Sequence, residues 1–147
     1  MRYEGGFEIE APPEKVWESF WDEAMMTAWL PGCQEAHWEG RKRVVGEVEQ
    51  SVAQLKARFA FEMEVVENEP PRHIRLRGEG RGISLGSSVS LEMSIRLEPA
   101  EGNRTRVAYE MEARITGKLA LVGNFVLKIK TRELERLMAA QVKERLE

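Results

Sequence analysis

The sequence predicts an α+β fold in which an antiparallel sheet of six to seven strands packs against one long C-terminal helix. Apolar and polar residues alternate with period two through most of residues 36–115, which is the pattern of half-buried strands. Short turns separate these segments and favour antiparallel neighbours. Residues 119–147 contain no proline and have helical spacing of their apolar side chains. A sheet that is apolar on one face must be covered, and this helix is the element large enough to cover it.

The N-terminal region predicts one strand followed by two short helices. Residues 3–10 alternate as a strand, with Phe7 and Ile9 on one face. Pro13 suits the first turn of a helix over residues 13–21, and a second helix is predicted over 23–28. Pro31 and Gly32 end that helix, because proline disfavours helix at the residue before it.

The central region predicts strands over residues 36–39, 43–53, 58–66, 73–82, 89–97 and 107–115. Their inward positions are rich in methionine and aromatic side chains, which suit a surface that repacks around a guest molecule. Glycines alternate at 78, 80 and 82 within one strand, where missing side chains leave room beneath the strand or allow it to bend. Both interpretations of these glycines remain open.

The predicted C-terminal helix over residues 119–147 would be about 40 Å long. One apolar stripe runs along it for packing on the sheet, formed by Leu127, Thr131, Leu134, Met138 and Val142. A second stripe lies roughly opposite at its start, formed by Leu121, Val122, Phe125 and Ile129. Three interpretations remain open for the second stripe: packing beneath the small helices near Trp29 and Leu30, contact with another protein including a second copy, or contact with a membrane.

Composition indicates a soluble globular protein with one domain over residues 1–147. Apolar residues make up 42% and charged residues 32%, and the net charge of −3 gives no overall basic field for nucleic acid. Basic residues nevertheless gather between Glu112 and Glu133, where no acid interrupts them. The single cysteine, Cys33, excludes an intrachain disulfide, and the absence of a signal peptide or apolar span predicts a cytoplasmic location.

The residue pattern gives little support for catalysis or for metal binding. The two histidines, His37 and His73, are far apart in sequence and show no metal-ligand spacing, and we expect both to be structural or solvent-facing. Cys33 follows a turn and is expected to be a small buried residue. We therefore expect no metal, no cofactor and no catalytic residue, with Tyr109 as the one acid or base for a cyclase- or isomerase-like alternative.

Several segments resemble one known family over nearly the whole chain. They are Met1-Arg2-Tyr3-Glu4-Gly5, Ala11-Pro12-Pro13-Glu14-Lys15-Val16-Trp17, Leu30-Pro31-Gly32-Cys33, Ala57-Arg58-Phe59, Gly78-Glu79-Gly80-Arg81-Gly82 and Leu97-Glu98-Pro99. These resemble the carbon-monoxide dehydrogenase G-subunit family of the START-like (helix-grip, polyketide cyclase/START/SRPBCC) superfamily. The resemblance implies a curved sheet wrapped around the C-terminal helix, with a cavity between them. Family members usually have a Gly-Pro turn before the Ala-Arg-Phe strand, whereas Ala53 and Gln54 stand there in this chain.

The resemblance further implies a non-enzymatic accessory role for a molybdenum-containing dehydrogenase, in assembly or at the inner face of the membrane. The expected ligand is an apolar molecule such as a quinone, an isoprenoid or a fatty acid, and Gln50 and Tyr109 are the expected polar groups inside. A filled core that serves only as a protein-binding or membrane-recruitment module is the alternative, and the protein is expected to be a monomer or a homodimer. The predicted cavity residues are Trp17, Trp21, Met25, Trp29, Leu30, Phe59, Phe61, Met63, Leu91, Met93, Tyr109, Met111 and Phe125.

Overall fold

The computed structural model describes residues 1–83 and 86–147, which form one curved antiparallel sheet with helices on its open side. Seven strands are arranged in the order β1-β7-β6-β5-β4-β3-β2. The strands are β1 (Arg2–Ile9), β2 (Cys33–Glu39), β3 (Arg43–Val52), β4 (Leu55–Glu69), β5 (His73–Gly82), β6 (Ser88–Ala100) and β7 (Arg104–Thr116). The helices are α1 (Pro13–Ser19), the 3₁₀ helix η1 (Glu23–Met25), α2 (Met26–Trp29), the 3₁₀ helix η2 (Lys118–Val122) and α3 (Asn124–Leu146). The predicted fold class is confirmed.

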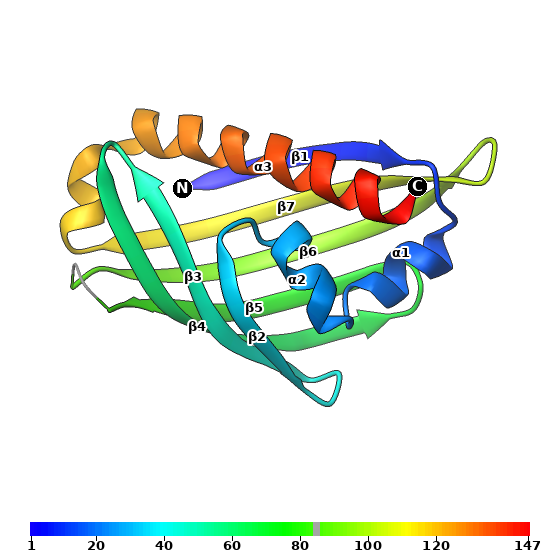
Figure 1. The fold of residues 1–147 in the computed structure, drawn as a ribbon, viewed down its shortest axis with the longest axis horizontal. Coiled ribbons are helices and arrows are strands. Elements are labelled where there is room, and N and C mark those ends of the chain that lie inside the picture. Colours follow the sequence, from blue (N-terminus) through cyan, green and yellow to red (C-terminus); the bar gives the residue numbers. More distant parts are fainter. Residues whose placement is uncertain (84–85) are drawn as a thin grey trace.

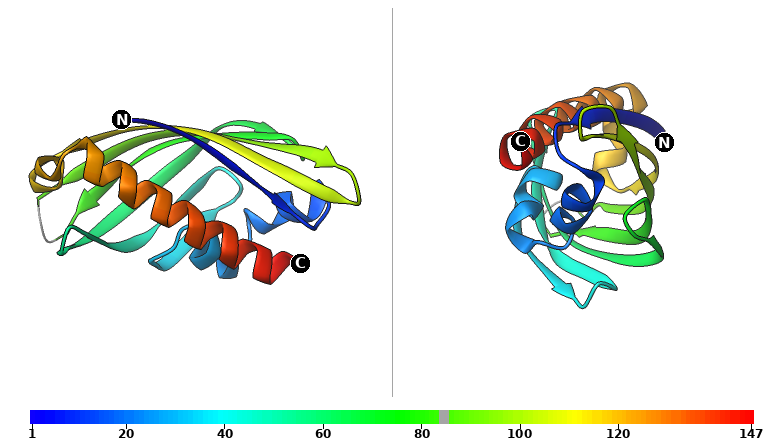
Figure 2. Two further views of the ribbon diagram at one scale, coloured as in Figure 1. Left: turned by 90° about the horizontal axis from the view of Figure 1, so that it is seen from above. Right: turned by 90° about the vertical axis from the view of Figure 1, so that its right-hand side faces the viewer.

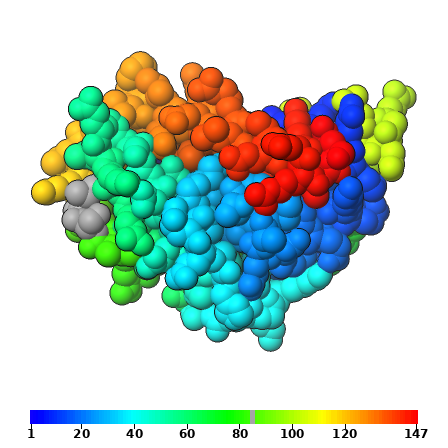
Figure 3. Space-filling view, viewed as in Figure 1, coloured from blue at the N-terminus to red at the C-terminus, as the bar shows by residue number. Residues whose placement is uncertain are grey.

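The sheet curls around the elements that close it. Seen end-on, the strands form an open trough, and α1, α2 and α3 lie along its open side (Figures 1 and 2). The C-terminal half of α3 packs directly on the small N-terminal helices (Figure 3). Arg145 fixes this contact, because its guanidinium donates to the carbonyl of Ala24 at 2.7 Å and to the hydroxyl of Thr27 at 3.0 Å.

The beginning of the C-terminal helix differs from the prediction. A continuous helix from residue 119 is wrong, because η2 ends at Val122 and α3 begins only at Asn124. Gly123 between them has a φ of +89°, which a right-handed helix does not accommodate. Leu121 and Val122 therefore lie on a separate short turn, not on the helix that carries Phe125 and Ile129.

The buried side chains form two clusters rather than one continuous core. The first cluster joins α1, α2 and the end of α3 to one end of the sheet, and consists of Phe7, Ile9, Ala11, Val16, Trp17, Phe20, Met25, Ala28, Ile74, Leu97, Val107, Val142 and Leu146. The second cluster joins β2–β4 to η2 and the start of α3, and consists of Cys33, Val44, Val48, Val52, Ala57, Phe59, Phe61, Leu119 and Leu127. The predicted inward stripe of α3 enters both, through Leu127 and Val142.

Two of the alternating glycines are required by close backbone contact: Gly78, and Gly82, where a Cβ would lie 2.7 Å from the Ser87 carbonyl oxygen. A Cβ at Gly78 would overlap the backbone carbonyl oxygen of Glu62 on the neighbouring strand. At Gly80, by contrast, a Cβ would meet only the side chain of Phe59, at an ordinary distance of 3.5 Å. Gly78 thus favours the bending interpretation, and Gly80 leaves space that a methyl group would fill.

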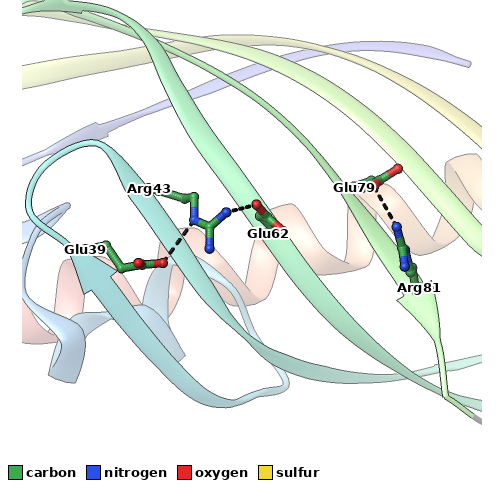
Figure 4. A network of polar contacts seen from close by, with 5 residues as sticks. All are labelled: Glu39, Arg43, Glu62, Glu79 and Arg81. Carbon is green, nitrogen blue, oxygen red and sulfur yellow. Dashed lines mark hydrogen bonds and ion pairs between the residues drawn. The ribbon is translucent and has the colours of Figure 1, made fainter.

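The outer face of the sheet carries charged side chains in ion pairs. Arg43 on β3 contacts Glu39 on β2 at 3.0 Å and also pairs with Glu62 on β4 (Figure 4). Arg81 and Glu79 pair along β5 at 3.5 Å. These groups are largely exposed, so they make this face soluble and add little to stability.

Candidate functional site

A row of incompletely buried apolar side chains lies between the two core clusters. Leu91 and Met93 on β6 and Met111 on β7 point to the inner face, and Met93 lies directly opposite Met111 in the strand register. All three are half-buried and belong to neither cluster, whereas Leu97 and Val107, farther along the inner face of the same strands, are buried in the first cluster. Because protein cores are normally close-packed, exposed surface on inward apolar groups indicates space between sheet and helix.

An open pocket of about 850 Å³ includes residues at this place, beneath the start of α3. Its lining includes Leu91, Ala113 and Ile115 from the inner face, with Asn124 and Leu127 of α3 above them. It also includes Glu62, Arg77, Glu92 and other side chains of the opposite face. Side chains at alternate positions lie on opposite faces of a strand, so the lining residues belong to both faces of the sheet. We call the part that faces α3 the inner compartment and the part lined by charged side chains the outer groove. The inner compartment is correspondingly smaller than 850 Å³.

The structure divides the predicted cavity residues into groups with different roles. Leu91 lines the inner compartment, and Met93 and Met111 extend the same half-buried row. Phe59 and Phe61 are buried in the second cluster, and Met63 and Leu30 pack against it. Phe125 does not line a cavity: its side chain is 77% exposed on the outside of α3, and its assignment was wrong.

The aromatic residues of the small helices are packed on one another rather than on an open space. Trp17 and Met25 are buried in the first cluster, and Trp21 and Trp29 pack against it. The rings of Phe20 and Trp29 are 4.8 Å apart, and the Trp29 indole donates to the Ser19 hydroxyl at 3.0 Å. Trp17, Trp21, Met25 and Trp29, all predicted to line the cavity, therefore belong to the packed core at the other end of α3.

A carboxylate lies on the inner side of α3, at Glu135. The Tyr3 hydroxyl donates to Glu135 Oε2 at 2.7 Å, and the Gly6 amide donates to Glu135 Oε1 at 3.1 Å. The Tyr109 hydroxyl lies beside Glu135, because a Cβ at Gly5 would be 2.5 Å from both groups, and the ring centroids of Tyr3 and Tyr109 are 6.3 Å apart. We call Glu135, Tyr3 and Tyr109 the Glu135 cluster; it ties the middle of α3 to β1 and β7.

Burial and the carboxylate keep both tyrosines protonated. Burial raises the pKa of Tyr109, and hydrogen bonding to the negatively charged Glu135 raises it further. The same causes raise the pKa of Tyr3, where nearby Arg132 acts in the opposite direction. Both hydroxyls therefore act as hydrogen-bond donors at neutral pH, which does not favour Tyr109 as a general base.

Sequence reasoning missed Glu135, although two signals point to it. At 100° per residue, Glu135 lies only about 20° from Val142, at the edge of the apolar stripe. The second signal is Gly5 in β1, where a Cβ would lie 2.5 Å from both Glu135 Oε1 and the Tyr109 hydroxyl. A glycine is needed there because the polar ends of Glu135 and Tyr109 meet above it.

The other polar residues singled out in the sequence are engaged in the fold. Gln50 donates from its side-chain amide to the Pro31 carbonyl, which secures the turn before β2. Cys33 is buried with its thiol against the Glu35 carbonyl at 3.3 Å, and burial raises the pKa of this thiol. His73 is buried and hydrogen-bonds to Ser94 at 2.8 Å. His37 is exposed and contacts Glu23 at 3.0 Å.

The second apolar stripe is exposed. Leu121 is 84% exposed and Ile129 51%, and together with Phe125 we call them the apolar patch. Packing of this stripe beneath the small helices is therefore wrong, because those helices contact the opposite end of α3. Only Val122 is half-buried, against the second cluster. The exposed Lys118, Lys128 and Arg132 lie on the same elements as the patch.

Metal sites and membrane spans are two further kinds of feature that a chain of this size can carry. Among residues 1–83 and 86–147, no group of three or more His, Cys, Asp or Glu side chains is arranged to hold a metal ion. Within the same ranges, no helix combines the length and apolar character needed to cross a membrane.

Comparison with solved structures shows a widely shared fold. A conserved protein from Geobacillus kaustophilus is 23% identical, with a TM-score of 0.89 over 99% of this chain and 95% of that one. A START superfamily protein from Mycobacterium smegmatis is 12% identical, with a TM-score of 0.71 over 99% and 96%. The Zhui aromatase/cyclase from Streptomyces sp. R1128 is 16% identical, with a TM-score of 0.70 over 99% and 93%.

At these identities the structures show the START-like fold alone, and a search of curated proteins returned no match. The family model of the carbon monoxide dehydrogenase G-subunit (CoxG) matches residues 5–147. That match takes in nearly all of the motifs noted in the sequence, the cavity beneath α3 and Glu135 itself. The chain therefore belongs to the CoxG family of carbon monoxide dehydrogenase proteins, with a START-like helix-grip fold.

Proposed function

We propose that this protein binds an apolar small molecule, such as a quinone, an isoprenoid or a fatty acid, in the inner compartment beneath α3. The observation that carries the proposal is the half-buried inner-face row of Leu91, Met93 and Met111 between two fully buried clusters. Flexible methionine side chains can adjust to guests of different shape. Ligand pockets are typically mostly apolar with few polar groups, which fits this row with the Glu135 cluster beside it.

A pair of tryptophan substitutions tests which compartment binds the ligand. Leu91→Trp fills the inner compartment, whereas Ser90→Trp places the same ring in the groove on the opposite face. We expect the neutral fluorophore N-phenyl-1-naphthylamine to bind to the natural protein and to the Ser90→Trp variant, and to lose binding in the Leu91→Trp variant. Loss of binding in Ser90→Trp alone would place the site outside the sheet, and an absence of binding by the natural protein would contradict the proposal.

We further propose that the apolar patch docks this end of the molecule on an anionic membrane surface. Leu121, Phe125 and Ile129 lie beside the cavity roof, so a docked protein could exchange ligand with the bilayer. Interfacial binding combines buried apolar surface with attraction of basic residues to anionic lipids, and Lys118, Lys128 and Arg132 supply that charge. Membership of the CoxG family supports a molybdenum-containing dehydrogenase as the enzyme that this carrier serves.

Vesicle sedimentation tests the docking proposal. We expect binding to vesicles of phosphatidylcholine with phosphatidylglycerol, weaker binding at high salt, and weaker binding after Phe125→Ser. Leu137→Ser is the matched control, because Leu137 is a 42% exposed apolar residue on the same helix outside the patch. Equal loss in both variants, or no vesicle binding at all, would contradict a membrane-docking patch and favour a protein partner.

A further inference from the structure

The Glu135 cluster adds a chemical preference to the compartment, and this inference rests on the proposed function. We propose that the Glu135 carboxylate is the polar end of the ligand site, and that it selects an uncharged apolar molecule with a terminal hydroxyl over one with a terminal carboxylate. The ligand tail lies in the inner compartment, and its hydroxyl donates to Glu135.

The position of the cluster next to the compartment supports this arrangement. Met1 and Ala113 line the cavity, and Tyr3 and Met111 are the next inward residues along the same two strands. Two residues along a strand advance by about 6.6–6.8 Å. On α3, Glu135 follows the cavity residue Leu127 by eight positions, about 12 Å along the helix. The half-buried row that contains Met111 connects the two places.

The hydrogen bonds of Glu135 leave capacity for one more donor. A carboxylate has two oxygens with roughly four acceptor sites. The Tyr3 hydroxyl and the Gly6 amide supply two donors, and the Tyr109 hydroxyl, which lies beside the same carboxylate, accounts for at most one more. A ligand hydroxyl can therefore donate to Glu135 without displacing any of them, because it fills the remaining site.

The charge of Glu135 explains the rejection of an acid. Within the described residues, no lysine, arginine or histidine nitrogen lies within the 4.0 Å of an ion pair with Glu135. Its hydrogen-bond donors are the neutral Tyr3 hydroxyl and the Gly6 backbone amide, and Arg132, which lies near Tyr3, makes no ion pair with Glu135, so the carboxylate keeps its negative charge. A ligand carboxylate brought beside it would experience like-charge repulsion in a partly desolvated place.

Two ligands that differ only in the terminal group test the preference. Displacement of N-phenyl-1-naphthylamine from the natural protein is measured with dodecan-1-ol and with dodecanoate at pH 8. We expect the alcohol to bind at least about tenfold more tightly, which corresponds to about 1.4 kcal/mol. Equal affinity for the two ligands would overturn the inference and leave the proposed function in place. If the fluorophore itself does not bind, the proposed function fails instead.

Substitutions then assign the preference to the carboxylate. In Glu135→Gln the negative charge is removed and the shape is kept, so dodecanoate should gain affinity and the preference should fall at least about fivefold. Tyr3→Phe keeps the charge and should keep the rejection of dodecanoate. Glu144→Gln is the control, because Glu144 is exposed on the same helix. A folded Glu135→Gln protein with an unchanged preference would overturn the role of Glu135.

Discussion

The substitution Gly5→Ala tests the packing of the Glu135 cluster most directly. The added Cβ would lie 2.5 Å from Glu135 Oε1 and from the Tyr109 hydroxyl, closer than real Cβ atoms approach other atoms. Both contacted atoms are at the ends of side chains, so the side chains can move away. Their movement breaks the hydrogen bonds that Tyr3 and Gly6 donate to Glu135.

The size of the effect follows from those two bonds. A hydrogen bond to a charged group contributes about 1.5–3 kcal/mol, and less where water reaches it. Replacement of glycine by alanine within a strand returns about 0.5–1 kcal/mol of conformational entropy. We therefore expect Gly5→Ala to lower the free energy of unfolding by about 2–4 kcal/mol.

A double-mutant cycle isolates the cause. In a Glu135→Ala background the hydrogen bonds to the carboxylate are already absent, so Gly5→Ala should cost less than in the natural protein, and the cost that remains is the overlap with Tyr109. The free energy of unfolding is measured by urea denaturation, followed by the fluorescence of the four tryptophans. Gly80→Ala is the control, because its Cβ would make an ordinary 3.5 Å contact. Additivity of Gly5→Ala and Glu135→Ala within about 0.5 kcal/mol would refute the reasoning.

Three further outcomes are expected. Tyr3 and Tyr109 are the two tyrosines of the chain, so the rise in absorbance at 295 nm with increasing pH reports their ionisation, and both should ionise above the ordinary tyrosine pKa of 10.0. Because the tyrosine pKa is higher in the folded than in the unfolded protein, the stability that this difference contributes is fully present below the unfolded pKa. The free energy of unfolding should therefore fall as pH rises above about 10. Ionisation of both tyrosines at about pH 10 in the folded protein would contradict this expectation. Val142→Ala removes two methyl groups from a fully buried side chain and should cost about 1.5–3 kcal/mol by urea denaturation, and a cost below about 0.5 kcal/mol would mean that α3 is not gripped there. Ser19→Ala leaves the Trp29 indole N–H without its acceptor and should cost about 1–2 kcal/mol, with a red-shifted tryptophan emission; unchanged stability would show that water replaces the hydroxyl.

Local sequence patterns predicted the structure correctly where a single geometric rule determines which side chains face inward. The period-two rows placed the inward residues of β4, β6 and β7 correctly, because alternate side chains of a strand must lie on opposite faces. The stripe through Leu127 and Val142 placed the inner face of α3 for the equivalent reason. The helical pattern of residues 119–147 did not predict the break at Gly123, whose positive φ separates η2 from α3.

The candidate site was less predictable, because its parts come from distant segments. Apolar inward rows cannot tell a filled core from a cavity, since both need the same residue types. Trp17 and Met25 proved to be buried in the core, whereas Leu91 lines the cavity and Phe125 is exposed, although all four are apolar and regularly spaced. Whether an inward apolar residue is buried in the core or lines a cavity depends on how far α3 lies from its strand.

The sequence by itself determined the antiparallel sheet, the covering helix and the family, because these follow from periodicity, turns and local motifs. Only the tertiary structure decided that Leu91, Met93 and Met111 are half-buried and lie outside both buried clusters, and that Glu135 meets Tyr3 and Gly6 across 132 and 129 residues of chain. The physical reason is that packing density and hydrogen-bond partners are properties of three-dimensional distance. The C-terminal end of α3 is held by the small helices, and its start is separated from β7 by η2 and Gly123. The space beneath the start of α3 follows from this arrangement and cannot be predicted from the residue pattern.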